Sequence, residues 1–269
     1  MTIAAFFALF LGFTLLGFGM CQSTPTVSQK ESFRSPAEFE PSPKPVIVAV
    51  IDTGFDFKSD WAAIIKAYPK FRKPRTCKYG NVDFTGTGLE DRHGHGTHVA
   101  GLIAQYADNS NYCLVIMKYF DKATDSSDHL DDTAKAFQRA IDLKVDIINY
   151  SGGGEEYSKN ECTLIKKALN AGIVVVAAAG NEGKNINDRK YYPAMCDDRV
   201  KAVGNIYNTG EYVQSSNFTD DGPKSRHLYN QIGYNIMSLA PNNQLFIMTG
   251  TSQSAAIQTG KIIKDWNKR

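Results

Sequence analysis

Residues 46–52 of the chain read V-I-V-A-V-I-D, and this stretch decides the fold. A continuous apolar run rich in β-branched residues is typical of a strand that is buried on both faces. The same signal returns along the chain at Leu114–Met117, Val145–Tyr150 and Ile173–Ala179, and more weakly at Val200–Val203 and Leu245–Met248. The sequence therefore predicts a sheet whose strands are covered on both sides.

Helical patterns lie between these apolar runs. Thr133–Leu143 places Ala134 and Phe137 on one face. Cys162–Asn170 is followed by Gly172, a residue type that commonly ends a helix. Strands that alternate with helices indicate a mostly parallel sheet with helices on both faces. We therefore expect an α/β fold, a three-layer αβα sandwich, with its chemistry at the carboxyl ends of the strands.

Composition and charge exclude several classes of protein. The chain has 269 residues, of which 42% are hydrophobic, so it can bury a sizeable core. Its 30 Lys and Arg nearly balance its 28 Asp and Glu. Because no long run of like charge occurs, the sequence predicts neither a nucleic-acid-binding arm nor a polybasic membrane patch. We expect a monomer that binds no nucleic acid.

The first 45 residues differ in composition from the rest. Ile3 to Met20 is apolar and uncharged, as in a signal peptide, and Cys21 follows where a bacterial lipoprotein would carry its lipid. A simple secretory signal and an uncleaved anchor remain as alternatives. Residues 22–45 hold five of the ten prolines and few aliphatic residues, which indicates an extended linker. We expect residues 1–21 to direct export (periplasmic, secreted or lipid-anchored) and residues 46–269 to form one folded domain.

Four further cysteines lie in the expected domain. They allow three disulfide connectivities, and in an exported chain two bridges are expected. Cys162 lies early in a helix and Cys196 in the loop before the next strand, so these two can meet. Cys77 and Cys113 would then pair by elimination. No C-x-x-C pair occurs, which argues against a zinc ribbon or a thioredoxin-like site.

Four polar motifs fall at the ends of expected strands or the starts of expected helices. Asp52 closes the first strand, and D-R-H-G-H-G-T-H-V-A-G-L-I-A runs from Asp91 to Ala104. V-V-A-A-A-G-N-E-G delivers Asn181 just after a strand, and G-T-S-Q-S-A-A places Ser252 at the start of the last helix. An acid, a base, a nucleophile and an amide donor are the groups that acyl transfer through a covalent intermediate requires.

In this order, the motifs resemble the subtilisin-like serine protease family (subtilases, peptidase S8 type), over about residues 46–260. The resemblance implies a subtilisin-like fold and a serine endopeptidase that hydrolyses peptide bonds through an acyl-enzyme. It implies that Asp52, His95 and Ser252 form the catalytic triad, with His95 as general base and Ser252 as nucleophile. It also implies that the Asn181 amide forms part of the oxyanion hole.

The resemblance extends to two substrate-binding segments. N-Y-S-G-G-G, residues 149–154, is similar to the substrate-binding strand of the family, and residues 177–180 match the opposite wall of the primary pocket. The substrate-binding residues so implied are Ser151, Gly152, Gly153, Gly154, Ala177, Ala178, Ala179 and Gly180. An uncharged, apolar side chain is therefore expected immediately before the cut. His98 matches a position that is structural in the family.

The chain departs from the family pattern beside the expected nucleophile. The family usually has Met, Ala and Pro where Gln253, Ser254 and Ala256 stand, so Gln253 brings a polar group to a position that is normally apolar. The turn at residues 107–112 is short and lacks the calcium-binding insertion of the family. We therefore expect no calcium there and no cofactor for catalysis. The linker is too short to be a folded pro-domain.

Two other classes of function use the same residues. The first is a zinc metallohydrolase, similar to the metallo-β-lactamase type, built on the closely spaced His93, His95 and His98. That motif needs Asp where Thr97 stands, and only His129 and His227 remain to complete the zinc site. The second is a non-catalytic peptide-binding relative of the fold. All three triad positions are filled, which argues against it.

An acidic segment, D-K-A-T-D-S-S-D-H-L-D-D, runs from Asp121 to Asp132. The resemblance places it beside a second strand that grips substrate. Its negative field would then favour Lys or Arg two to four residues before the scissile bond. The alternative is a solvated segment that caps the next helix with Asp131 and Asp132. A calcium site is a weaker option, because the spacing does not follow the EF-hand pattern.

Overall fold

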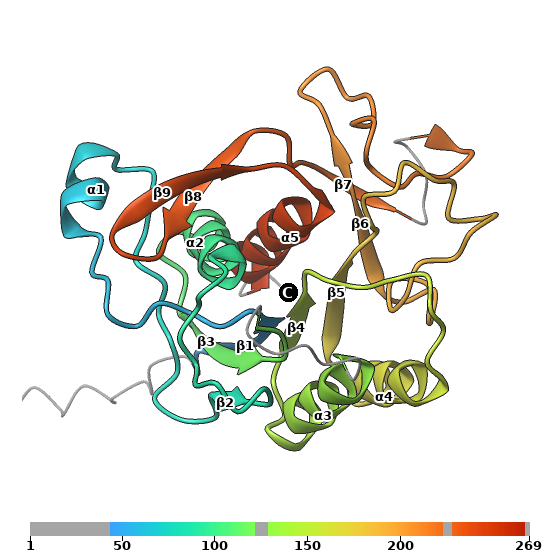
Figure 1. Cartoon of the computed structure of the whole chain (residues 1–269), viewed down its shortest axis with the longest axis horizontal. Coiled ribbons are helices and arrows are strands. Elements are labelled where there is room, and N and C mark those ends of the chain that lie inside the picture. Colours follow the sequence, from blue (N-terminus) through green and yellow to red (C-terminus); the bar gives the residue numbers. More distant parts are fainter. Residues whose placement is uncertain (1–43, 122–128, 223–227, 267–269) are drawn as a thin grey trace, which may run out of the picture. The chain divides into compact units, whose positions relative to one another are not determined.

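Seven parallel strands form the central sheet, in the order β2-β3-β1-β4-β5-β6-β7 (Figure 1). The fold is described from a computed structural model, over residues 44–121, 129–222 and 228–266. The signal segment 1–21 and nearly all of the linker 22–45 lie outside the described residues. The strands are β1 (Val46–Asp52), β2 (Val82–Asp83), β3 (Tyr112–Lys118), β4 (Ile147–Tyr150), β5 (Val174–Ala178), β6 (Lys201–Ile206) and β7 (Tyr229–Ile232).

Helices cover both faces of this sheet, which confirms the expected three-layer α/β fold. One face packs against α2 (His95–Ala107) and α5 (Thr251–Trp266), and the other against α3 (His129–Asp142) and α4 (Lys159–Asn170). A short helix, α1 (Ala62–Ala67), lies outside the sheet. Along β1, Val48 and Val50 enter the first core, while Ala49 and Ile51 enter the second. All four side chains are fully buried, as the continuous apolar run predicts.

The prediction that Leu245–Met248 belongs to the parallel sheet is wrong. This run lies in β9 (Gln244–Met248), which pairs antiparallel with β8 (Ile236–Ala240) in a separate hairpin. Two of the three residues of the turn, Asn242 and Asn243, have φ of 59° and 56°. This left-handed pair, which Asn tolerates, produces the tight turn between antiparallel strands.

Other differences concern the ends of elements. The helix predicted to begin at Thr133 begins at His129, with Asp131 and Asp132 in its first turn, where carboxylates interact favourably with the helix dipole. β2 and β7 were not predicted. β7 reads Y-N-Q-I and lies at one edge of the sheet, so it lacks the apolar run that marks the central strands.

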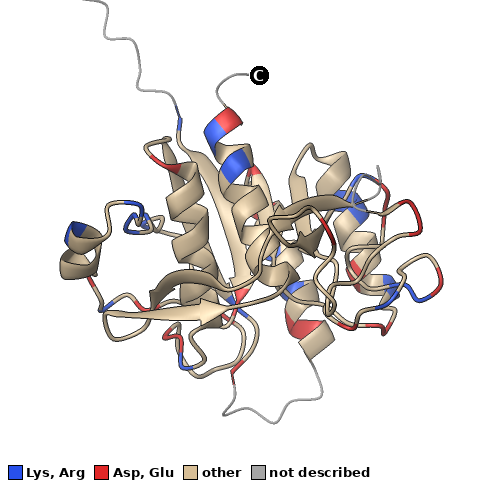
Figure 2. Cartoon of the chain, turned by 90° about the horizontal axis from the view of Figure 1, so that it is seen from above, with Lys and Arg blue, Asp and Glu red and all other residues tan. Residues whose placement is uncertain are grey.

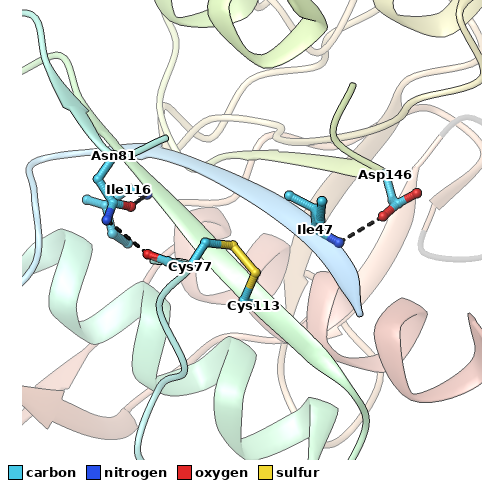
Figure 3. The surroundings of a disulfide bond; sticks show 6 residues. All are labelled: Ile47, Cys77, Asn81, Cys113, Ile116 and Asp146. Carbon is cyan, nitrogen blue, oxygen red and sulfur yellow. Dashed lines mark hydrogen bonds between the residues drawn. A yellow bond between two sulfur atoms is a disulfide. The ribbon is translucent and has the colours of Figure 1, made fainter. Parts of the chain in front are cut away.

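Both disulfides join the cysteines that the sequence pairs, Cys77 with Cys113 and Cys162 with Cys196. Figure 3 shows the first bridge, which ties the segment before β2 to β3. The backbone of Cys77 donates to Leu114 O at 2.8 Å. Nearby, the Asn81 side chain donates to Cys77 O at 3.2 Å and accepts from Ile116 N at 2.8 Å. The bridge and these bonds therefore fix one edge of the sheet.

The acidic segment is only partly described, because residues 122–128 lie outside the described part of the chain. Its first residue, Asp121, is buried, and its carboxylate accepts from Lys118 Nζ at 2.5 Å. Lys118 is itself fully buried at the end of β3. The charge of Asp121 is therefore balanced within the fold and adds little to an external negative field. Elsewhere on the described ribbon, positions occupied by Lys or Arg and by Asp or Glu are interspersed (Figure 2).

Candidate active site

Asp52 and His95 meet where the end of β1 approaches the first turn of α2. His95 Nδ1 lies 2.7 Å from Asp52 Oδ1. The Asp52 carboxyl is buried, whereas 21% of the His95 side chain is exposed. The carboxylate therefore favours the tautomer with a proton on Nδ1, which leaves Nε2 as the nitrogen that can accept a proton.

Close approach of the two segments requires glycine at position 96. A Cβ atom on Gly96 would collide with Gly54 O and lie 3.2 Å from Asp52 Oδ1. Gly96 N instead donates to Thr53 Oγ1 at 2.9 Å. The glycine that follows His95 in the motif therefore lets the histidine reach the carboxylate.

A buried carboxylate, Asp91, holds the start of α2 in place. Its Oδ1 accepts from Thr53 Oγ1 at 2.8 Å, His93 N at 3.1 Å and Gly94 N at 2.7 Å. Its Oδ2 accepts from Thr97 N at 2.8 Å and Thr97 Oγ1 at 2.7 Å. Backbone N–H groups at the first turn of a helix have no intrahelical acceptor, and a carboxylate there is also favoured by the helix dipole. Asp91 therefore fixes the helix that carries His95.

Two opposing effects set the pKa of His95. Burial lowers it, but the charge of Asp52 and the hydrogen bond to that carboxylate raise it by more, with a smaller contribution from Asp91. The net result is a His95 pKa above its ordinary value. Burial lowers the pKa of His98 to about 4, and its Nε2 lies 3.1 Å from the carbonyl oxygens of Ile236 and Phe246. His98 is therefore a neutral residue that ties α2 to the β8–β9 hairpin.

Ser252 lies in the first turn of α5. Its hydroxyl donates to Ser151 O at 2.8 Å, and Ser151 Oγ donates back to Ser252 O at 3.1 Å. Asn149 supports this pair, because its Nδ2 donates to Ser151 Oγ at 3.0 Å and its Oδ1 accepts from Thr259 Oγ1 at 2.7 Å. The hydroxyl is therefore directed to Ser151 O, and a rotation about one side-chain bond would free it.

Asn181 approaches the same helix from the end of β5. Its Oδ1 accepts from Thr251 N at 2.8 Å and from Thr251 Oγ1 at 3.1 Å. Thr251 Oγ1 in turn accepts from Gly180 N at 3.1 Å. Since the carboxamide oxygen is held by Thr251, its Nδ2 remains as the donor that can face a developing negative charge.

The two expected walls of the primary pocket are close together and have a tyrosine between them. A Cβ atom on Gly153 would lie 2.6 Å from Tyr191 Cε1, and one on Gly180 would lie 2.7 Å from Cδ2 of the same ring. Tyr191 is 8% exposed. Its ring therefore fills much of the space between the walls, which the sequence did not indicate.

The expected substrate-binding strand is partly paired within the chain. Gly154 N donates to Tyr192 O at 2.9 Å, and Tyr192 N donates to Gly154 O at 2.7 Å. Gly154 therefore uses both of its backbone groups in a bridge to Tyr192. Ser151, Gly152 and Gly153 form the part of the strand that leads from this bridge to Ser252.

The polar residues after Ser252 are accommodated in a regular helix. Gln253 is buried, with Nε2 3.7 Å from Met248 Sδ. Ser254 Oγ donates to Gln231 O at 3.0 Å, and Ala256 is fully buried. The departure from the family pattern therefore leaves the first turn of α5 helical.

The histidines of the alternative zinc site are engaged separately. His95 contacts Asp52 through Nδ1 and His98 contacts backbone carbonyls, while the His93 and His95 rings lie 6.1 Å apart. His227 lies outside the described residues. Over residues 44–121, 129–222 and 228–266, no three His, Cys, Asp or Glu side chains are close enough to share a metal ion.

Comparison with known families agrees with this geometry. The sequence profile of the Subtilase family (peptidase S8) matches residues 44–267. The chain belongs to the subtilase family, a family of serine peptidases. The match covers the whole sheet and every motif from Asp52 to Ser252.

Individual relatives are about 30% identical to this subtilase over the aligned residues. It is 31% identical to the major intracellular serine protease of Bacillus subtilis over 231 residues, which is 81% of this chain and 67% of that protein. It is 32% identical to subtilisin amylosacchariticus of Bacillus subtilis subsp. amylosacchariticus over 216 residues, 78% of this chain and 52% of that protein. A solved cold-adapted subtilisin-like serine proteinase has the same fold, with a TM-score of 0.66, 21% identity and coverage of 84% of this chain and 77% of that one.

The pKa of His95 provides a test that does not depend on activity. We expect an NMR titration of the imidazole signals to give His95 a pKa above about 6.5, the ordinary value. In Asp52→Asn, the pKa should fall below that value, because burial remains while the charge is removed. His98 should stay neutral in both proteins down to a pH near its pKa of about 4. An unchanged His95 pKa in Asp52→Asn would contradict the assigned contact.

Proposed function

We propose that this subtilase is an exported endopeptidase that hydrolyses peptide bonds through an acyl-enzyme formed on Ser252. The observation that carries the proposal is the 2.7 Å contact between His95 and Asp52. Ser252, the proposed nucleophile, lies in the first turn of α5. These are the groups that a base-activated nucleophile requires. All of them belong to the protein, so the proposed reaction needs no cofactor.

The reaction would begin when the Ser252 hydroxyl turns from Ser151 toward His95. His95 Nε2 accepts the hydroxyl proton as Ser252 Oγ attacks the carbonyl carbon, and Asp52 stabilises the resulting imidazolium. The Asn181 Nδ2 and the Ser252 backbone N–H would donate to the oxyanion, since a first-turn N–H has no intrahelical acceptor. His95 then gives its proton to the leaving amine. A water molecule next attacks the acyl carbon while His95 accepts its proton, and His95 returns that proton to Ser252 Oγ as the carboxylic acid product leaves.

The triad assignment predicts non-additive losses. Ser252→Ala or His95→Ala should each remove nearly all peptide hydrolysis, about 10⁶-fold in kcat, and the double variant should lose little more because the residues act together. Asn181→Ala should lower kcat by about 10²–10³-fold with little change in KM. A fluorophosphonate probe should label the wild type and Asn181→Ala, and leave Ser252→Ala unlabelled. Full additivity of the two triad losses would contradict a shared mechanism.

Tyr191 leads to a prediction about the residue immediately before the cut. Because its ring lies between Gly153 and Gly180, we expect the wild type to prefer Gly, Ala or Ser there. Tyr191→Ala should raise kcat/KM for Leu or Phe by at least about tenfold, since each buried methylene contributes about 0.8 kcal/mol. Tyr79→Ala, which truncates a tyrosine that is 76% exposed, is the matched control. The profile is measured with a peptide library on variants that unfold cooperatively, and a wild type that prefers Phe would refute the prediction.

Export is supported by the uncharged run from Ile3 to Met20 and by the two disulfides, which are typical of oxidising compartments. Among the described residues, no helix is long and apolar enough to cross a membrane. We expect the protein isolated from its source to begin at or after Cys21 and to contain both bridges. Intact-mass analysis and non-reducing peptide mapping test this, and mapping also detects a lipid on Cys21. A full-length cytoplasmic chain with four free thiols would contradict export.

A further inference from the structure

A second cavity lies beside the expected substrate-binding strand. Its volume is about 340 Å³, and its walls come from the end of β3, the start of α3, the strand Gly153–Gly154 and the start of α4. Its walls include the aromatic side chains of Tyr119, Phe120, Tyr150 and Tyr192, the backbone of Gly153 and the carboxyl of Glu161. The triad mechanism uses none of these side chains.

Glu161 is the unexpected member of this set. It is 1% exposed, and its Oε1 has no hydrogen-bond partner among the described residues. The sequence S-K-N-E at residues 158–161 matches a capping box, in which the glutamate would bond back to the backbone of the first residue. Ser158 does cap the helix, since its Oγ accepts from Glu161 N at 3.2 Å. The Glu161 side chain, however, lies against the cavity with one oxygen unsatisfied.

Such a group needs a partner, because a buried polar atom without one is costly. Burial raises the pKa of Glu161 to about 7, against a hydrogen bond with Thr133 that lowers it. The side chains around it include the hydroxyls of Tyr119 and Tyr150 and, on the cavity wall, Glu156 and His129. Among the residues that the structure describes, no Lys or Arg lines the cavity. A cation that entered it would meet a carboxylate and aromatic faces, both of which attract positive charge.

The position of the cavity relative to Ser252 indicates that a side chain of a bound peptide would supply the cation. Ser252 Oγ contacts Ser151 O, and Gly153 and Gly154, two and three residues along the same strand, line the cavity. An extended chain advances about 3.3 Å per residue, so a peptide alongside this strand would place at the cavity a side chain two to four residues before the cut.

We propose that this cavity is a substrate subsite for a Lys or Arg side chain two to four residues before the scissile bond, with Glu161 as its counter-ion. The inference rests on the proposed endopeptidase function and adds its substrate class: peptides that carry a basic residue upstream of a small residue at the cut. The source of the charge is Glu161, not the acidic segment that begins at Asp121.

The test uses internally quenched peptides that differ only in one residue, Lys or norleucine, at each of the three upstream positions. At pH 8.5, where a carboxyl with a pKa of about 7 is ionised, we expect the wild type to have kcat/KM at least about tenfold higher for Lys at one position. Glu161→Gln should reduce this ratio to near one, and Glu161→Leu should reverse it in favour of norleucine. Glu211→Gln, which removes an exposed carboxylate that does not line the cavity, should leave the ratio unchanged.

Binding separates this inference from the proposed function. Calorimetry of the same peptides with Ser252→Ala should show tighter binding of the Lys peptide, and Ser252→Ala/Glu161→Gln should lose the difference. If no peptide is hydrolysed and Ser252 is not labelled, the endopeptidase proposal fails. The difference in binding between the Lys and norleucine peptides would still show whether the cavity binds a cation through Glu161. Equal kcat/KM values for the Lys and norleucine peptides in the wild type would overturn the proposed subsite. It would also be overturned if the preference survived in Glu161→Gln but was lost in Asp125→Asn/Asp128→Asn, because the acidic segment would then be its source.

Discussion

The five hydrogen bonds that the buried Asp91 carboxylate accepts hold together the two segments on which the site depends. They join Thr53, just after β1, to the first turn of α2, so the strand that ends in Asp52 and the helix that begins with His95 form one unit. A buried carboxylate is tolerated because every bond it accepts is charge-assisted and the helix dipole adds to them. The absence of a side chain at Gly96 then lets the two segments touch.

The part of the site around Ser252 is held by neutral groups rather than by a carboxylate. Around Ser252, Asn149 and Thr259 form a network of neutral hydroxyl and amide groups, and no ion pair among the described residues contributes to it. Neutral hydrogen bonds are weaker than charge-assisted ones, so the Ser252 hydroxyl can exchange one acceptor for another at little cost. The segments that carry Asp52 and His95 are therefore held by charged hydrogen bonds, whereas the Ser252 hydroxyl is held by neutral groups and can turn.

Local sequence patterns were enough to place β1, Asp52 and His95. An apolar run followed by a polar residue marks a buried strand that ends in Asp52, and glycines beside His95 mark the start of a helix. Tyr191 and Glu161 could not be found this way. Tyr191 lies in a loop after both glycines in the sequence, and its ring comes close to Gly153 and Gly180 only in the folded protein. Glu161 lies in a sequence that reads as a helix cap, and only its burial distinguishes it from one. The strand Leu245–Met248 was misplaced because an apolar run does not reveal its pairing partner.

Stability does not explain why a carboxyl is buried at position 161. The pKa of Glu161 is raised above its ordinary value of 4.5 to about 7 in the folded protein. The folded state therefore binds the proton more tightly than the unfolded state does, and folding stability from this group falls as pH rises between those two values. Leu or Met at position 161 would avoid the free-energy cost of burying a carboxyl. A cation bound against Glu161 would lower its pKa again and recover the lost interaction, which couples the ionised carboxyl to an occupied subsite. Because the Tyr191 ring lies between Gly153 and Gly180, discrimination among substrates of the proposed endopeptidase would come mainly from charge upstream of the cut.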